Sequence, residues 1–190
     1  EFLYEHSRKP FKIIHTHGWL TSSAFMLKHL YNIPWIHTIH ALERNRLNSM
    51  TEGEKQLFKL TSWIEDTISD ADKLICVSKS VQKEVIKSFG NSADKTIVIP
   101  NAVDLKLFSP QEKKSRTVLT ISRFSKEKGS HFLPEIIDEV LSKTKDSRFI
   151  AIIQETNLLG LLDIQSKFVE LTKKYLERFI WVSKPIYALE

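Results

Sequence analysis

Short, continuous apolar runs alternate along this chain with longer segments whose apolar residues recur at helical spacing. A strand that is apolar at nearly every position is buried on both faces, which is typical of parallel sheets packed between helices. The runs expected to be strands are 12–15, 35–39, 74–77, 97–99, 118–121, 149–153 and 179–182. This alternation predicts an α/β fold with parallel sheets.

Apolar stripes in the intervening segments predict four helices. Thr51 and Glu54 form a possible capping box for the first of them. Gly90 is placed for a C-terminal cap of the second, and Pro134 is tolerable in the third because it lies near the first turn. The four stripes are Leu57, Leu60, Ile64 and Ile68; Val81, Val85, Ile86 and Phe89; Phe132, Leu133, Ile136, Ile137, Val140 and Leu141; and Leu161, Ile164, Phe168, Leu171 and Tyr175.

One stretch breaks the alternation and predicts a domain boundary. Pro100 and Pro110 bracket a segment that leads into the polar run 111–116 before the next apolar strand. Proline and charge between apolar strands are typical of an inter-domain linker. We therefore expect one domain over 1–108, a linker over 109–116 and a second domain over 117–190.

Composition excludes several classes of protein. The chain is 42% hydrophobic, enough for a core, yet no apolar run approaches the roughly 18 residues that a membrane span needs. With 5 glycines in 190 residues, neither the GxGxxG nor the GxxxxGK phosphate loop occurs. The single cysteine, Cys76, excludes disulfide frameworks and CxxC redox chemistry, and its apolar neighbours predict a buried, inert thiol.

The net charge of +5 admits nucleic acid, an anionic membrane surface or a phosphorylated small molecule as a partner. Lysines dispersed over solvated helix faces explain the same charge without any partner. Basic residues do not interleave with exposed aromatic residues, as a nucleic-acid surface requires, so we expect no nucleic-acid partner.

The loop after the run 118–121 is a candidate phosphate site. Arg123 and Lys128 flank the start of a helix expected near Ser130, and Gly129 lets the backbone approach a ligand closely. Free N–H groups at a helix N-terminus and two cations suit a phosphate or diphosphate. The alternative is two solvated cations in a surface loop.

Four histidines end the first two strand runs: His15 and His17 in the first, His37 and His40 in the second. They gather at one edge of the sheet if those strands are neighbours. A zinc site is one interpretation, but no cysteine or nearby carboxylate supports it, so we expect no metal. Acid–base work or hydrogen bonding to a sugar or phosphate is favoured for one imidazole, and packing for the others.

Taken in order, five blocks resemble family 4 glycosyltransferases, the group that contains glycogen and starch synthases. The first two are IIHTHGW at 13–19 and PWIHTIHALE at 34–43. DADKLICVS at 70–78 is similar to the family's ADxxIxVS strand, and IPNAVD at 99–104, with Phe108 and Pro110, to its IPNGVD connection. Ser122, Arg123 and Phe124, followed by Lys128 and Gly129, resemble the GRL…KG loop of its second domain.

The resemblance implies a GT-B architecture, with two Rossmann-like parallel-sheet domains facing across a cleft, only parts of which this chain holds. It implies retaining transfer from a nucleotide sugar without an obligatory metal or other cofactor. Arg123 and Lys128, with Gly129, would bind the donor diphosphate and stabilise the leaving group. His40 would line the sugar site, and His17 and Trp19 would lie near the acceptor. Asn101 and Asp104 would fix the inter-domain turn.

The sequence also departs from the family pattern. Ala102 replaces the usual glycine, and IIQE at 152–155 stands where the family has a glycine-containing loop. The family's N-terminal glycine-rich loop and its C-terminal pair of glutamates have no counterpart, and 185–190 resembles a helix cut short. We therefore expect a partial chain that is inactive by itself.

The function expected from the sequence is an enzyme that moves a sugar, glucose above all, from a nucleotide-sugar donor to a glucan or other glycan in glycogen-type carbohydrate metabolism. One alternative is a family 4 enzyme with a lipid-linked or small acceptor, although no amphipathic basic helix indicates a membrane anchor. Another is a non-catalytic α/β module that binds nucleotides or partners. No signal or transit peptide is visible, so we expect a cytoplasmic location.

Overall fold

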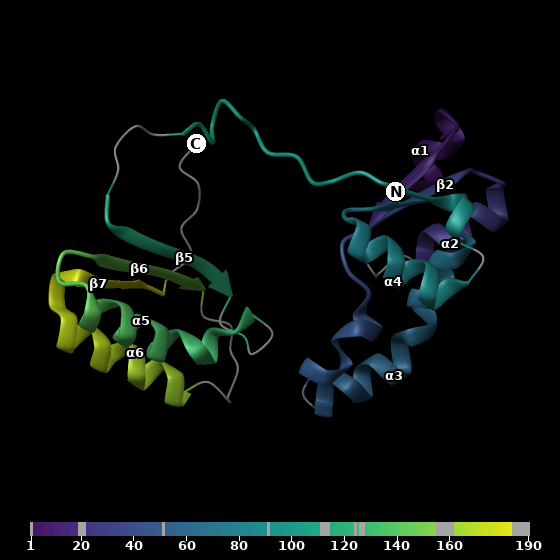
Figure 1. Ribbon diagram of the computed structural model, residues 1–190. Coiled ribbons are helices and arrows are strands. Elements are labelled where there is room, and N and C mark those ends of the chain that lie inside the picture. Colours follow the sequence, from purple (N-terminus) through teal and green to yellow (C-terminus); the bar gives the residue numbers. More distant parts are fainter. Residues whose placement is uncertain are drawn as a thin grey trace. The chain divides into compact units, whose positions relative to one another are not determined.

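The computed structural model describes residues 2–18, 22–50, 52–90, 92–110, 115–123, 125, 128–154 and 162–183. The chain forms two compact units, Glu1–Phe108 and Ser109–Glu190 (Figure 1). The assignment of these units to an acceptor side and a donor side stays a prediction.

The first unit is built on a four-stranded parallel sheet in chain order. Its strands are β1 (Ile14–His17), β2 (Trp35–Ile39), β3 (Lys73–Cys76) and β4 (Thr96–Val98). This confirms the predicted parallel α/β architecture. The strand β2 has the predicted bounds, whereas β1 lies two residues beyond its predicted position.

Helical segments precede the first strand of this unit and connect its strands (Figure 1). They are α1 (Phe2–Arg8), α2 (Ser22–Tyr31), η1 (Glu43–Ser49), α3 (Glu52–Asp66), η2 (Thr67–Asp70), α4 (Lys79–Phe89) and η3 (Ala93–Lys95), where η denotes a 3-10 helix. The apolar stripes predict α3 and α4 but not α1, α2 or η1. In α2, Met26 and Leu30 are exposed while Ala24 is buried, so its apolar residues form no single stripe.

The first unit has its own apolar core. Trp35 and Ile39 of β2 and Leu74 and Cys76 of β3 are almost completely buried, together with Val85 of α4. The prediction of a buried Cys76 is therefore confirmed, and burial raises the pKa of its thiol.

The ends of α4 combine one predicted and one unpredicted signal. Gly90 is the C-cap with φ of 55°, as the sequence predicts. At the other end, the side chain of Ser78 accepts a hydrogen bond from the N–H of Val81 at 3.2 Å. The proposed capping residue of α3, Thr51, lies outside the described residues.

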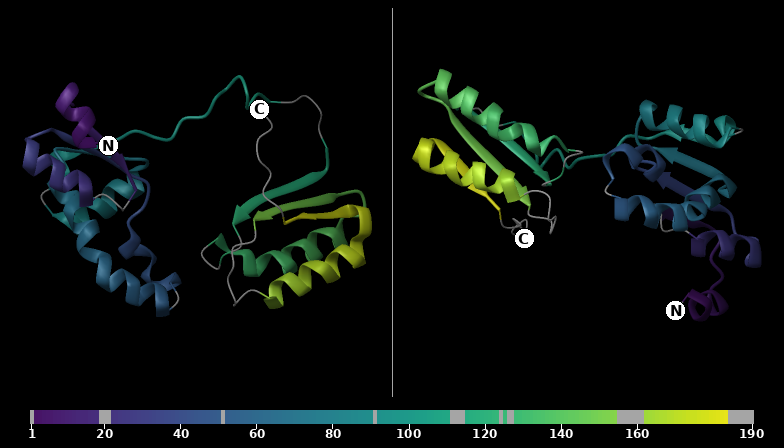
Figure 2. Two further views of the ribbon diagram at one scale, coloured as in Figure 1. Left: turned by 180° about the vertical axis from the view of Figure 1, so that it is seen from behind. Right: turned by 90° about the horizontal axis from the view of Figure 1, so that it is seen from below.

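The second unit holds a three-stranded parallel sheet, β5 (Thr117–Arg123), β6 (Arg148–Gln154) and β7 (Phe179–Val182). Its helices are η5 (Ser130–Phe132), α5 (Leu133–Lys143), α6 (Leu162–Tyr175) and η6 (Leu176–Arg178). Figures 1 and 2 show α5 and α6 on the same face of the sheet. They enclose a core of Ile137, Leu141, Phe149, Phe168 and Phe179. Pro134 lies in the first turn of α5, as predicted.

Several apolar residues of the predicted stripes are exposed. Leu57 and Leu60 of α3 are 56% and 75% exposed, and Phe132 and Ile136 near α5 are 56% and 45% exposed. The predicted stripes are therefore only partly buried. Helical spacing places them on one face of the helix but does not decide which neighbouring element covers that face.

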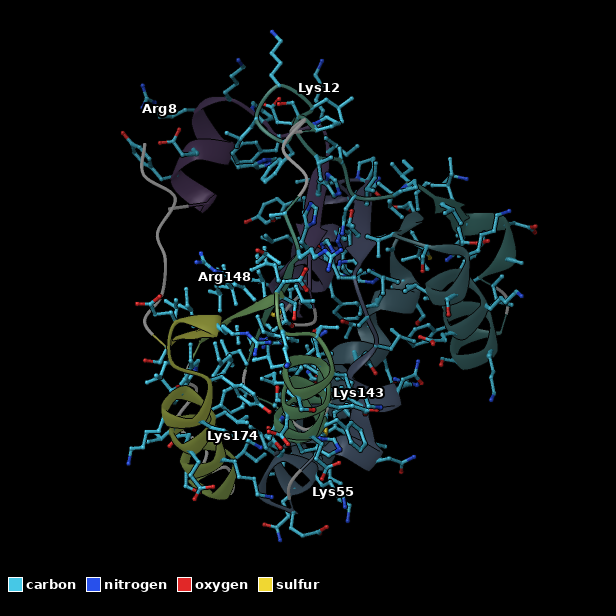
Figure 3. All side chains as sticks on the ribbon, turned by 60° about the vertical axis from the view of Figure 1, so that its left-hand side comes forward. Arg8, Lys12, Lys55, Lys143, Arg148 and Lys174 are labelled. Atoms are coloured by element: carbon cyan, nitrogen blue, oxygen red, sulfur yellow. The ribbon has the colours of Figure 1, made fainter. Side chains whose placement is uncertain are left out.

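Positive charge is spread over many elements of the chain. Figure 3 labels six cations that come from α1, the segment before β1, α3, α5, β6 and α6: Arg8, Lys12, Lys55, Lys143, Arg148 and Lys174. Lys55, Lys143 and Lys174 form ion pairs with nearby carboxylates. In the part of the chain that the structure describes, no helix is both long enough and apolar enough to cross a membrane.

Candidate active site

The carboxyl ends of β1 and β2 bring together the histidines singled out in the sequence. The two strands pair in parallel with His17 opposite Thr38, so their ends meet at one edge of the sheet. His15 and His17 are two residues apart and point to the same face of the sheet. His40 directly follows β2 and is exposed, like His15 and His17.

His17 and His40 are in direct contact at this edge. Nδ1 of His17 lies 3.3 Å from Nε2 of His40, and their ring centroids are 5.5 Å apart. His15 extends the cluster, because its ring centroid lies 4.7 Å from that of His17. Its Nε2 is hydrogen-bonded to Thr38 Oγ1 at 2.8 Å. Two exposed imidazoles can donate hydrogen bonds to a sugar hydroxyl and accept them from it.

His37 belongs to the opposite face of the sheet and is 1% exposed. Its Nδ1 is hydrogen-bonded to Thr16 Oγ1 at 2.9 Å, and that oxygen accepts a hydrogen bond from Trp35 Nε1 at 2.7 Å. Burial, as the largest cause, and the nearby charges of His17, His15 and His40 together lower the pKa of His37 to about 4. His37 is thus a neutral packing histidine, the role the sequence analysis reserved for some members of the cluster.

Among the residues that the structure describes, no three His, Cys, Asp or Glu side chains are grouped so as to hold a metal ion. The proposed acceptor residue Trp19 lies outside the described residues, so its place beside His17 stays a prediction.

The second candidate cluster follows β5 in the other unit. Arg123 is the last residue of β5, and both Arg123 and Lys128 are exposed. Lys128 N donates to the carbonyl oxygen of Ser125 at 3.2 Å, so the loop turns back before the helical segment that begins at Ser130. Both cations therefore belong to one short loop at the carboxyl end of a parallel strand, the usual place of ligand sites in such sheets.

Ser130, the residue at the expected start of the helix, holds this loop in place. It is fully buried, and its hydroxyl donates to the carbonyl oxygen of Arg123 at 3.0 Å while accepting from the N–H of Ser125 at 3.2 Å. The feature of the sequence that could have indicated this role is a serine directly after the Lys128-Gly129 pair. Small hydroxyl side chains commonly bond to loop backbone in this manner.

Gly129 has a specific conformational reason to be glycine. Its φ is 71° and its ψ 18°, in the left-handed region that residues with a Cβ rarely adopt. An added Cβ would lie 3.7 Å from the Phe132 ring, which is ordinary contact. The backbone angle, rather than lack of space, is what favours glycine here.

The segment after β4 contains the predicted turn residues. Asp104 Oδ1 accepts a hydrogen bond from the N–H of Lys106 at 2.8 Å, and Phe108 N donates to the Asp104 carbonyl at 2.9 Å. Asp104 therefore fixes a turn at the end of the first unit. Ala102 is absent from the described non-glycine residues with positive φ, so the substitution of alanine for glycine causes no left-handed strain. Among the described residues no hydrogen bond of the Asn101 side chain is seen, so its expected role stays a prediction.

Comparison with known proteins identifies the class to which these features belong. The model of Glycosyltransferase Family 4 matches residues 2–107, and the chain belongs to that family. The fold agrees, because the chain superposes on the crystal structure of Anabaena HepE in complex with UDP and glucose with a TM-score of 0.66. That comparison covers 96% of this chain and 50% of HepE at 16% identity, and it shows the GT-B fold.

Among curated relatives, glycogen synthase of Mycobacterium tuberculosis (strain CDC 1551 / Oshkosh) is 30% identical over 126 residues, 63% of this chain and 30% of the relative. D-inositol 3-phosphate glycosyltransferase of Corynebacterium jeikeium (strain K411) is 25% identical over 159 residues, 75% of this chain and 38% of the relative. The chain thus spans about a third of the length of these two relatives.

Proposed function

We propose that the protein to which this chain belongs is a retaining glycosyltransferase that moves glucose from a nucleotide-sugar donor to a glucan or a related glycan. The observation that carries the proposal is the match of residues 2–107 to the family, supported by the 30% identity to a glycogen synthase. The GT-B fold is compatible with it but does not by itself specify an activity.

In this proposal the loop after β5 binds the donor. Arg123 and Lys128 bind the diphosphate and stabilise the negative charge that develops on it as the bond to the sugar breaks. Their exposure, and the hydrogen bonds through which Ser125 and Ser130 fix the loop, support this role. Gly129 lets the backbone turn between Lys128 and the helical segment that begins at Ser130. Two cations supply the charge stabilisation, so the reaction as proposed uses no metal and no cofactor.

The histidine edge of the first unit serves the sugar side of the reaction. His40 hydrogen-bonds the transferred sugar, and His17, together with Trp19, lies on the acceptor side. The contact of 3.3 Å between His17 and His40 supports a joint role, since it fixes the orientation of both rings.

A donor and acceptor screen tests this function. The full-length protein, supplied with UDP-glucose or ADP-glucose and with glycogen as acceptor, is expected to release the nucleoside diphosphate and extend the glucan. Replacing Arg123 or Lys128 by Ala should lower turnover by about a hundredfold or more. Arg116→Ala is the matched control, because Arg116 precedes the opposite end of β5 and pairs with Asp146. Near-normal turnover of Arg123→Ala and Lys128→Ala would overturn the donor assignment.

A small phosphorylated acceptor is the second candidate, because a relative covering 75% of this chain is a D-inositol 3-phosphate glycosyltransferase. The same assay with D-inositol 3-phosphate in place of glycogen separates the two. Transfer to inositol phosphate but not to glycogen would overturn the glucan proposal. Transfer to a lipid-linked acceptor alone would overturn both the glucan and the inositol phosphate proposals. Nucleotide binding without transfer to any acceptor indicates a non-catalytic module instead.

A further inference from the structure

Glu65, near the end of α3, is the most deeply buried carboxylate among the described residues, with 1% of its surface exposed. Its Oε1 accepts a hydrogen bond from the backbone N–H of Glu43 at 2.5 Å. Its Oε2 accepts from Arg44 Nε at 2.6 Å and from the Arg44 backbone N–H at 3.4 Å. A buried charge persists only when it is paired and hydrogen-bonded, and Glu65 meets both conditions.

These donors are the first residues of η1, whose N-terminus receives no side-chain cap from its own preceding residue, Leu42. Orphan N–H groups at a helix start need an acceptor, and a carboxylate is a strong one. Glu65 therefore supplies from α3 the cap that η1 lacks locally.

Arg44 ties the same point to two further elements. Its Nη2 donates to Asp66 Oδ1 at 2.5 Å, and its guanidinium carbon lies 4.8 Å from the ring centroid of Phe89 at the end of α4. The start of η1 is thus held by α3 and α4 together, with Glu65 at the centre of the contacts.

His40 lies in the short bridge between this anchor and β2. On one side Ile39 ends β2, and its carbonyl accepts from Val77 N at 3.4 Å. On the other side Leu42 is fully buried and Glu43 is bonded to Glu65. His40 and Ala41, both exposed, are the residues between the anchors, so the direction of the His40 side chain depends on where Glu43 is fixed.

We propose that Glu65 is a positioning residue for His40: by binding the backbone N–H groups of Glu43 and Arg44, its carboxylate fixes the segment that holds His40 against His17. The consequence for turnover rests on the proposed function, whereas the effect on the His17–His40 contact does not. Glu65 touches neither histidine and acts through the backbone of η1.

The test measures the ring-to-ring nuclear Overhauser effects between His17 and His40 in the 190-residue chain, with imidazole signals assigned by single His→Gln variants. Glu65→Gln keeps the size of the side chain but removes the charge and replaces one of the two accepting oxygens by an NH2 group, which cannot accept from the Glu43 or Arg44 donors that it faces. It is expected to abolish these effects and to shift both imidazole signals. Asp66→Asn is the matched control, since it removes the neighbouring, 64% exposed partner of Arg44 and should leave them unchanged.

A second pair of variants removes only the backbone hydrogen bond. Glu43→Pro deletes the N–H that Glu65 accepts, and proline suits the first position of a helix. The preceding Leu42 has φ of −95° and ψ of 130°, which a residue before proline readily adopts. Glu43→Ala is its control, because it keeps the N–H and loses the same ion pair with Arg46.

Loss of the ring-to-ring effects in Glu65→Gln and Glu43→Pro, with retention in both controls, supports the proposal. Retention in a folded Glu65→Gln or in Glu43→Pro, or equal loss in a control, overturns it. If Glu65→Gln does not fold, the comparison of Glu43→Pro with Glu43→Ala decides.

In the full-length protein, Glu43→Pro should lower kcat by about tenfold with the donor KM unchanged. An inactive wild-type protein with the ring contacts behaving as expected would refute the proposed function and leave the positioning role intact.

Discussion

Asp72 accepts a hydrogen bond from the backbone N–H of Trp35, with 2.7 Å between Oδ2 and the nitrogen. Its other carboxylate oxygen lies 2.7 Å from Lys28 Nζ, and Lys28 also donates to the carbonyl oxygen of Asp70 at 2.6 Å. One carboxylate thereby joins α2 to the amino ends of β2 and β3. This is the structural reason for an aspartate before the strand in the motif at 70–78.

Replacing Asp72 by Ala is expected to lower the free energy of unfolding of the first unit by about 1–3 kcal/mol. The reason is that the N–H of Trp35, a fully buried residue, loses its charged acceptor and Lys28 loses its partner. Urea unfolding followed by hydrogen exchange of the β2 amides measures the change. Asp70→Ala removes an adjacent exposed carboxylate and should change stability by less than about 0.5 kcal/mol. Equal losses in the two variants would show that the hydrogen bond to Trp35 is unimportant.

The lowered pKa of His37 makes the free energy of unfolding of the first unit depend on pH. Its pKa is lowered from 6.5 to about 4 in the folded chain, chiefly by burial, so the unfolded chain binds more protons between these values. Stability is therefore expected to fall as the pH falls from 6.5 towards 4, by about 3 kcal/mol in all, and to be independent of this group above 6.5. His37→Gln should flatten that dependence, measured as unfolding free energy at about pH 7 and about pH 5. His29→Gln, which removes an exposed histidine, should keep the wild-type slope, and an unchanged slope in His37→Gln would contradict the assignment.

The sequence predicted the histidine edge better than it predicted the helix faces, and the reason is geometric. Alternation within a strand and the parallel pairing of β1 with β2 are enough to bring His17 close to His40, although they did not reveal that His37 points to the other face. A helical stripe such as Leu57 and Leu60 states only which side of α3 is apolar. Whether that side is buried depends on other elements, and the one fully buried side chain of α3 is the charged Glu65.

Ser130→Ala is expected to destabilise the second unit by about 1–2 kcal/mol, because the Arg123 carbonyl and the Ser125 N–H lose the same buried hydroxyl. Trp181 reports on this unit alone, since it is the only tryptophan after residue 108 and its ring packs 5.3 Å from that of Phe168. Ser142→Ala is the control: that hydroxyl is exposed on α5 and bonds only within the helix, to Glu139 O. A loss in Ser130→Ala no larger than in Ser142→Ala would show that the hydroxyl does not hold the loop.

The shape of the loop after β5 depends on contacts that local sequence patterns do not predict. Cations beside a glycine after an apolar strand were enough to single out Arg123 and Lys128. The hydrogen bonds that give their loop its shape run from Ser130 back to Arg123 across seven residues, and no spacing rule used for helices or strands includes such a contact. The roles of the buried Glu65 and Ser130 depend on which backbone groups lie opposite them, and that follows only from the folded chain.

Gly129→Ala is expected to destabilise the second unit by about 1 kcal/mol, the usual cost of placing a Cβ at a left-handed φ, here 71°. The space around the position is sufficient, so the loss should come from the backbone alone. Gly129→Asn tests this directly, because asparagine tolerates the left-handed region better than alanine although its side chain is larger. Trp181 fluorescence during denaturant unfolding is expected to rank wild type above Gly129→Asn and Gly129→Ala lowest. The opposite order for the two variants would indicate a steric limit instead. Gly53→Ala is the converse case, because Gly53 lies inside α3 and no atom lies near an added Cβ. This variant is expected to raise the free energy of unfolding of the first unit by about 0.5 kcal/mol. Amide hydrogen exchange of the first unit measures the change.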